Sequence, residues 1–107
     1  MMGGAMQGLG WALHEQMTYD EQGQLLTGSF MDYDLPKMKN TPTIETVIIE
    51  VPSDHGPYGA RGVGEPPIVP TAGAIANAVA DAIGARLSDM PMTAPRVLAA
   101  LNGSHKN

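Results

Sequence analysis

The residue with the clearest chemical potential is Glu65, a carboxylate at the end of a glycine-rich run. Three glycines precede it and two prolines follow it: Gly59, Gly62, Gly64, Pro66 and Pro67. Glycine reaches positive φ angles and lets a ligand approach the backbone closely, whereas a proline restricts the residue before it to extended conformations. The run therefore predicts a carboxylate held in one direction beside an accessible backbone. From the glycines alone, a plain strand-to-helix connection is an equally good interpretation.

The segments on either side place this run between a strand and a helix. Residues 43–51 carry apolar side chains at both odd and even positions, which predicts a central strand, and a turn cluster over residues 52–57 follows it. Pro70-Thr71-Ala72 then opens a helix, whose first N–H groups and positive dipole end favour anions. A carboxylate beyond a strand end and before a helix occupies a position where α/β folds often bind ligands.

A second glycine-rich stretch lies at the start of the chain, over residues 3–10. It contains four glycines, and Met6, Leu9 and Leu13 recur at helical spacing, so we expect a helix to follow the glycines. Glycines inside a helix cost up to about 1 kcal/mol each, which indicates that a ligand or another segment comes close to this backbone. Gln7 is its only polar side chain, and its amide both donates and accepts hydrogen bonds. The alternative is a closely packed helix with Gln7 merely exposed.

The whole pattern predicts a single α+β domain over residues 1–107. After the N-terminal helix, residues 17–28 predict a β-hairpin around Gly23, and the strand at 43–51 adds to a small mixed sheet. Two C-terminal helices follow. The first ends at Gly84, and the second starts at Thr93-Ala94-Pro95 and stops at Asn102-Gly103.

Composition excludes several classes of function. The net charge is −5 and basic runs are missing, so nucleic-acid binding is not expected. The sequence has no cysteine, which excludes thiolate metal sites within these residues. Neither an apolar run of about 20 residues nor a basic signal-peptide start is present, so we expect no membrane association and a cytoplasmic location.

Other catalytic constellations are not supported. His14, His55 and His105 are far apart in sequence and form no His-Glu-x-x-His motif, so exposed histidines are favoured over metal ligands. No serine lies in a nucleophile elbow, and Gly62-Val63-Gly64 does not continue into a phosphate-binding loop. Arg61 has the length to pair with Glu65 or to bind an anion, although an exposed arginine is the commoner outcome.

Taken together, the two glycine stretches resemble one known family. Gly3-Gly4-Ala5-Met6-Gln7-Gly8-Leu9-Gly10 and Gly62-Val63-Gly64-Glu65-Pro66-Pro67 are similar to segments in the C-terminal part of a large subunit. That subunit is the molybdenum-binding one of the xanthine dehydrogenase, aldehyde oxidase and aerobic carbon monoxide dehydrogenase family. The likeness spans nearly the whole chain, and the two stretches are specific in combination.

The resemblance implies an enzyme part and a cofactor. It implies that Glu65 is the general base beside molybdenum, that Gln7 lies near the pterin, and that Arg61, Gly62, Val63 and Gly64 pass by the metal without ligating it. The implied reaction is oxidative hydroxylation of an aldehyde, an N-heterocycle or a related small substrate. The implied partners are the remainder of the molybdenum subunit and iron–sulfur and flavin subunits or domains. The cofactor would be molybdopterin, alone or as its cytosine dinucleotide.

The chain is far shorter than a complete molybdenum subunit, which leaves two functions open. It is either a C-terminal segment that contributes the base to a molybdenum hydroxylase, or a non-catalytic folded remnant without a site. In both cases we expect the isolated chain to bind no cofactor, to be inactive and to self-associate into homo-oligomers.

Overall fold

The structure is a computed structural model of the chain, and it describes residues 1–104. It contains three α-helices and two short 3-10 helices, in the order α1 (Met2–Leu13), η1 (Met38–Asn40), η2 (Pro57–Gly59), α2 (Ile68–Ile83) and α3 (Ala94–Ser104). All three helices lie in the regions where the apolar spacing predicts them. The fold class predicted from the sequence is nevertheless wrong, because the described residues form an all-helical structure and not an α+β domain.

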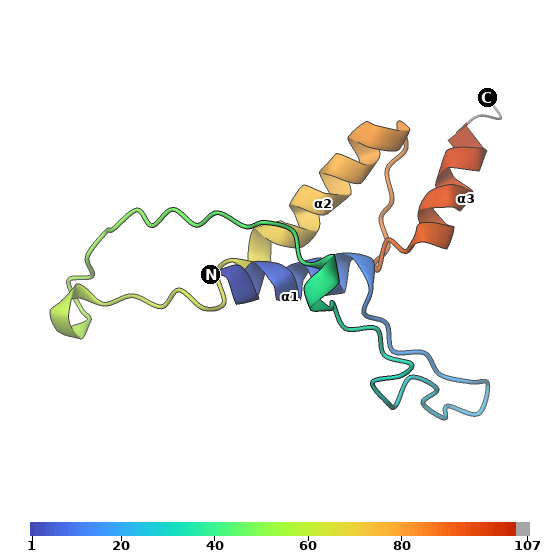
Figure 1. Cartoon of the computed structure of the whole chain (residues 1–107), viewed down its shortest axis with the longest axis horizontal. Helices are drawn as coiled ribbons and strands as arrows, with labels where there is room; N and C mark the ends of the chain where they lie inside the picture. Colours follow the sequence, from blue (N-terminus) through green and yellow to red (C-terminus); the bar gives the residue numbers. More distant parts are fainter. Residues whose placement is uncertain (105–107) are drawn as a thin grey trace.

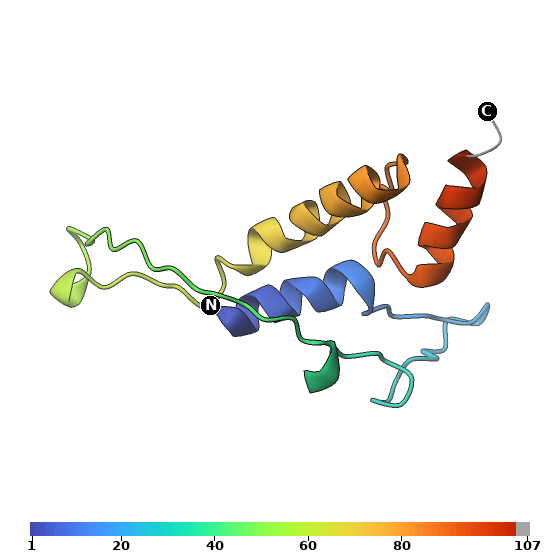
Figure 2. The same cartoon turned by 45° about the horizontal axis from the view of Figure 1, so that its top comes forward.

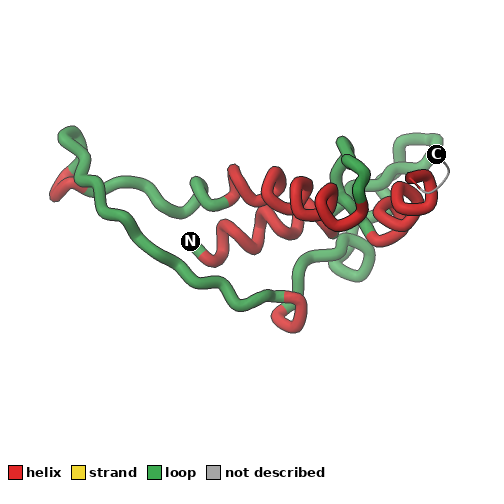
Figure 3. The backbone as a smooth tube through the Cα atoms, turned by 90° about the horizontal axis from the view of Figure 1, so that it is seen from above, coloured by secondary structure: helices red, strands yellow, loops and turns green. Residues whose placement is uncertain are grey.

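The helices gather at one end of an elongated molecule (Figure 1). α1 and α2 lie side by side, and α3 follows beyond the far end of α1 (Figure 2). Between η1 and α2 the chain makes a long excursion away from the helices and returns, with η2 at its tip (Figure 3). We call residues 43–67 the long loop. Its outgoing limb is residues 43–51, its tip is residues 52–59, and its returning limb is residues 60–67.

The molecule is expanded for its length. Its radius of gyration is 17.7 Å, whereas a compact chain of 100 residues has about 13 Å. Its accessible surface is 8289 Å², against about 5,700 Å² for a compact monomer of this mass. The excess surface shows that much of what a folded domain normally buries is exposed in this chain.

The predicted hairpin forms as a turn and not as a pair of strands. Gly23 has a φ of 80° and donates to the Asp20 carbonyl, and one antiparallel bridge joins Tyr19 to Leu25. The Asp20 carboxylate accepts hydrogen bonds from the Gln22 and Gln24 backbone N–H groups, which holds the turn. Pairing stops after this bridge, and a two-stranded ribbon without further strands beside it is at best marginally stable.

The predicted central strand at residues 43–51 is also wrong for this chain. The segment is drawn out along the outgoing limb of the long loop, but it pairs with no other part of residues 1–104. A strand requires a neighbour to receive its backbone hydrogen bonds. The sequence pattern identifies the tendency to form a strand, and residues 1–104 do not supply the partner.

The core is small and lies where the helices meet. Among the described residues, its buried side chains include Ala12 of α1 and Met92, which precedes α3, with exposed fractions of 0% and 3%. The Met92 backbone N–H donates to the Ala12 carbonyl over 2.7 Å and fixes the approach to α3. The described residues therefore have a small core.

The helix boundaries partly follow the predictions. α2 ends as expected at Gly84, which has a φ of 69° and donates to the Ala80 carbonyl. α1 includes the glycines that were expected to precede it. α3 continues through Asn102-Gly103 to Ser104, so the predicted stop there is wrong. Residues 105–107, which include His105, lie outside the described residues.

We expect the isolated chain to self-associate through its exposed apolar side chains. These include Trp11, Phe30, Met31, Val69 and Leu98, which are 46%, 85%, 96%, 81% and 56% exposed. Apolar patches beyond a few hundred Å² usually find a partner. Sedimentation at micromolar concentration should give a mass above the 11.2 kDa of one chain. A single species of 11.2 kDa would show instead that this surface tolerates water.

Candidate functional site

Glu65 lies directly before α2 and is joined to its first turn. The Ile68 N–H donates to the Glu65 carbonyl over 2.9 Å, and the Val69 N–H donates to the Pro66 carbonyl over 3.3 Å. Pro67 is the N-cap residue of α2, so Glu65 lies two residues before the N-cap. Its side chain is exposed. The structure thus confirms the predicted position at a helix start, where the helix dipole favours a carboxylate.

The two glycines nearest to Glu65 are open to solvent in this chain. Neither Gly62 nor Gly64 has a positive φ, and a Cβ built on either would meet no atom of the described residues within 4 Å. Within residues 1–104, the N–H groups of residues 62–65 donate to no protein acceptor. The positive φ expected for this run occurs only at Gly59, with 75°. The returning limb therefore presents unpaired N–H donors beside Glu65.

Arg61 binds two backbone carbonyls of the long loop, which is neither the ion pair with Glu65 nor the anion binding described above. Its Nε donates to the Val51 carbonyl over 2.5 Å, and a terminal nitrogen donates to the Pro52 carbonyl over 3.1 Å. Within residues 1–104 it forms no ion pair with Glu65. The guanidinium thus ties the returning limb of the long loop to the end of the outgoing limb.

The glycines of α1 bring the two glycine-rich stretches together. A Cβ on Gly4 would lie 2.6 Å from the Gly64 carbonyl oxygen, and a Cβ on Gly8 would lie 2.6 Å from Cβ of Thr71. Both distances are shorter than side-chain carbons tolerate, so the close approach of α2 and its preceding loop requires glycine at both positions. The sequence predicts that either a ligand or another segment comes close to this backbone, and the structure shows another segment.

Gln7 lies within one helical turn of the contact that places Gly64 beside α1. It is three residues after Gly4 and is exposed. Residues three apart are neighbours on a helix surface, so Gln7 lies beside Gly4 on α1. The structure therefore places the polar side chain of the first stretch and the backbone of the second at the same end of the α1 and α2 pair.

The loop tip contains a strained residue that the sequence did not single out. Tyr58 has a φ of 55°, although it is not a glycine, and its side chain is fully exposed. Four hydrogen bonds hold the tip: the Ser53 N–H donates to the Gly59 carbonyl, the Gly59 N–H donates to the Gly56 carbonyl, and the Ser53 hydroxyl accepts from the His55 and Gly56 N–H groups. The turn residues in the sequence signalled a bend here but not its rigidity. A hollow of about 430 Å³ follows both limbs near this tip, and Glu65 does not line it.

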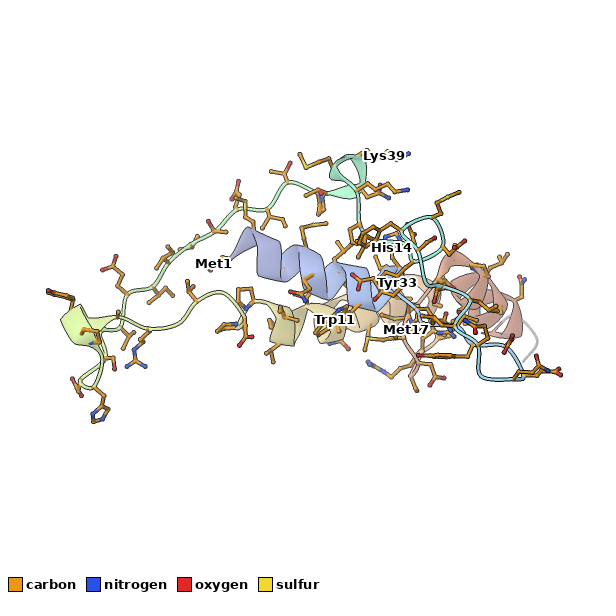
Figure 4. The ribbon with its side chains drawn as sticks, turned by 90° about the horizontal axis from the view of Figure 1, so that it is seen from below. Met1, Trp11, His14, Met17, Tyr33 and Lys39 are labelled. Atoms are coloured by element: carbon orange, nitrogen blue, oxygen red, sulfur yellow. The ribbon has the colours of Figure 1, made fainter. Side chains whose placement is uncertain are left out.

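The opposite end of α1 carries a separate polar cluster (Figure 4). His14 Nδ1 lies 3.0 Å from Asp34 Oδ2, and the Tyr33 hydroxyl donates to Glu15 over 2.7 Å. The hydrogen bond to Glu15 raises the pKa of Tyr33 above its usual value, because the bonded phenol must keep its proton. These contacts tie the chain after α1 to the segment before η1, and they lie apart from Glu65.

No group of three or more His, Cys, Asp or Glu side chains within residues 1–104 is arranged to hold a metal ion. His55 is exposed in the loop tip. In the same part of the chain, no helix is both long and apolar enough to span a membrane.

The groups near Glu65 fit a polar heterocyclic cofactor. The unpaired N–H groups of the returning limb can donate, the Gln7 amide can donate and accept, and the Glu65 carboxylate can take a proton. The open faces of Gly62 and Gly64 leave room for a flat group against the backbone. Their hydrogen-bonding groups suit one side of such a cofactor, and no described residue near them belongs to a group of three or more side chains that could hold a metal ion.

The chain is similar to molybdopterin-binding proteins. Residues 1–42 match the family described as "Molybdopterin cofactor-binding domain". The chain is 38% identical over 96 residues to a putative xanthine dehydrogenase molybdenum-binding subunit of Escherichia coli K12, covering 89% of this chain and 13% of the relative. It is 43% identical over 98 residues to the carbon monoxide dehydrogenase large chain of Hydrogenophaga pseudoflava, covering 89% of this chain and 12% of the relative.

A solved structure extends this likeness to the arrangement of the chain. The crystal structure of quinoline 2-oxidoreductase from Pseudomonas putida 86 superposes with a TM-score of 0.85 at 31% identity, over 94% of this chain and 13% of that one. The chain belongs to the family of molybdenum-binding large subunits of xanthine dehydrogenase and carbon monoxide dehydrogenase, of which it corresponds to a C-terminal region. It spans about an eighth of the length of these relatives.

Proposed function

We propose that the chain is a C-terminal segment of a molybdenum hydroxylase catalytic subunit and that Glu65 is the general base of its reaction. The observation that carries this proposal is the position of Glu65 at the start of α2. There the exposed carboxylate adjoins unpaired N–H groups, and α1 packs against the same loop. A base must reach the proton that it removes, and an exposed, positioned carboxylate meets that requirement.

Each residue of the site has a defined task in this proposal. Gln7 binds the pterin through its amide, and the N–H groups of Gly62, Val63 and Gly64 donate to the cofactor along the returning limb. Arg61 holds this limb through the carbonyls that it already binds. Glu65 accepts, on a carboxylate oxygen, the proton that the oxygen nucleophile releases. The molybdenum cofactor, when bound, supplies the two-electron oxidation.

The proposal also defines the partners of the chain. Its relatives are subunits of multi-subunit complexes, and the chain spans only about an eighth of their length. We therefore infer that the remainder of the molybdenum subunit completes the cofactor site and that iron–sulfur and flavin subunits or domains carry the electrons away. The substrate would be an aldehyde, an N-heterocycle or a related small molecule, which is bound by residues outside this chain.

Molybdenum analysis tests the proposal in two proteins. The first is the isolated chain. The second is a hybrid subunit, in which this chain replaces the matching segment of the Hydrogenophaga pseudoflava large chain. We expect stoichiometric molybdenum in the hybrid subunit and almost none in the isolated chain, because a partial cleft leaves most of a ligand in water. A hybrid subunit that is folded but free of molybdenum would support the alternative, a non-catalytic remnant. Stoichiometric metal in the isolated chain would show that it contains a complete site.

A further inference from the structure

The outgoing limb of the long loop is an extended segment with an unsatisfied backbone. Within the described chain, no N–H or C=O group of residues 43–50 takes part in a hydrogen bond. The Val51 carbonyl, at the end of the limb, accepts from Arg61. Unpaired groups along an extended chain are a template for another strand.

The side chains of this limb are apolar on both of its faces. In an extended chain, alternate residues share a face. One face therefore carries Val47, Ile49 and Val51 with Glu45, and the other carries Ile44 and Ile48 with Thr46 and Glu50. Val47, Ile48, Ile49 and Val51 are 77%, 68%, 84% and 61% exposed. A strand that is apolar on both faces is typical of the interior of a sheet covered on both sides.

A second copy of the chain is a poor partner for this limb. A ribbon of two copies would leave both apolar faces in water, and two-stranded ribbons are marginal by themselves. Charge also opposes the two registers that pair the limb along its full length: an antiparallel register with residue 44 opposite residue 51 sets Glu45 against Glu50. A parallel register sets each glutamate against its own copy. Like charges directly opposite each other destabilise a strand pair.

The remainder of the subunit is the better partner, because it supplies both neighbouring strands and covering layers. The chain spans 12% and 13% of two relatives, so most of such a subunit lies outside it. We propose that residues 43–51 are an internal strand of a sheet whose other strands come from the rest of the molybdopterin-binding subunit, with no acidic side chain opposite Glu45 or Glu50. This inference rests on the proposed function for the identity of the subunit.

Pairing of this strand would also fix the position of the site. Arg61 binds the carbonyls of Val51 and Pro52, so the end of the strand is tied to the limb that leads to Glu65. A strand held in a sheet therefore fixes the returning limb at Arg61. At the other end of the limb, the hydrogen bond from the Ile68 N–H to the Glu65 carbonyl fixes it to α2. The same partner that pairs with residues 43–51 would orient the loop beside the cofactor.

Hydrogen exchange of the backbone amides in residues 43–51 tests the proposal. In the isolated chain these amides should exchange as fast as an unfolded peptide, even where self-association occurs through the helices. In the hybrid subunit their exchange should slow by at least about 100-fold, because ladder hydrogen bonds must open first. Ile48→Pro, which removes an N–H at the centre of the strand, should abolish the protection. The matched control Ile48→Val keeps the N–H and the branched side chain and should retain it.

The outcomes test the internal strand at residues 43–51 separately from the proposed function in a molybdenum hydroxylase. Rapid exchange of residues 43–51 in a folded hybrid subunit would overturn the strand. Protection that appears in the isolated chain between about 1 and 100 μM would also overturn it, since mass action would then identify a second copy as the partner. Protection in a hybrid subunit that lacks molybdenum would support the strand while the proposed function fails. The unsubstituted proteins decide these outcomes, so they do not depend on the folding of Ile48→Pro.

Discussion

Replacing Glu65 by glutamine in the hybrid subunit should lower turnover by about 10²–10⁴-fold, the typical cost of losing a positioned general base. Glutamine keeps the length and hydrogen-bonding capacity of the side chain but does not accept the proton. The Glu65 side chain makes no hydrogen bond within residues 1–104, so the substitution breaks no contact of the described chain. Molybdenum content and folding should be unchanged. Steady-state turnover, normalised to molybdenum, is the measurement.

Two further variants make this experiment specific. Glu65→Asp keeps the charge but withdraws it by one methylene, so it should recover part of the activity if proton transfer is the task. Glu21→Gln removes a carboxylate from the exposed turn after α1 and should leave turnover unchanged. If Glu65→Gln turned over within about threefold of the parent, far less than the usual loss of a base, Glu65 would be a structural residue of the loop.

Replacing Gly4 by alanine should destabilise the α1 and α2 pair by about 1–3 kcal/mol, the usual cost of overpacking. The new Cβ would lie 2.6 Å from the Gly64 carbonyl oxygen and 3.2 Å from Cβ of Pro67. A backbone oxygen moves only with its chain, so α1 must shift away from the loop that carries Glu65. In the isolated chain, thermal unfolding followed by far-ultraviolet circular dichroism measures the loss.

Gly3→Ala is the matched control for this effect. Gly3 is also in α1, but a Cβ there would meet nothing within 4 Å. Alanine is a better helix former than glycine by about 1 kcal/mol, so Gly3→Ala should stabilise the chain. Equal midpoints for Gly3→Ala and Gly4→Ala would show that the contact between α1 and Gly64 is absent in solution.

The helices were predictable from the sequence because their stabilising contacts are local or internal to this chain. Ile75 and Val79 repeat at helical spacing, and Gly84 supplies the left-handed residue that ends α2. The sheet was not predictable in the same way. Val47 and Ile49 show the tendency to form a strand, but pairing depends on a partner, and the described residues provide none.

The features of the site also divide into those that local sequence predicts and those that depend on contacts between distant residues. The motif at Gly62-Val63-Gly64-Glu65 located the exposed loop and its carboxylate, and the spacing placed that carboxylate at a helix start. The contact between Gly4 and Gly64 was not predictable, because it joins residues sixty positions apart through backbone atoms. The Arg61 hydrogen bonds were missed for a similar reason, since carbonyl acceptors leave no signature in a sequence.

The hydrogen bonds at the two ends of the returning limb leave its middle, residues 62–64, without a hydrogen bond from its N–H groups to the described residues. Arg61 and the Ser53 contacts close residues 51–61 into a ring, which constrains the tip and its strained Tyr58 as one unit. Glu65, bonded through its carbonyl to Ile68, travels with α2. Residues 62–64 connect the constrained tip to Glu65 and α2. Because glycine has the widest torsional freedom of any residue, Gly62 and Gly64 let the tip and α2 change their relative orientation until the end of the outgoing limb is held, while α1 and α2 together fix the backbone at Glu65.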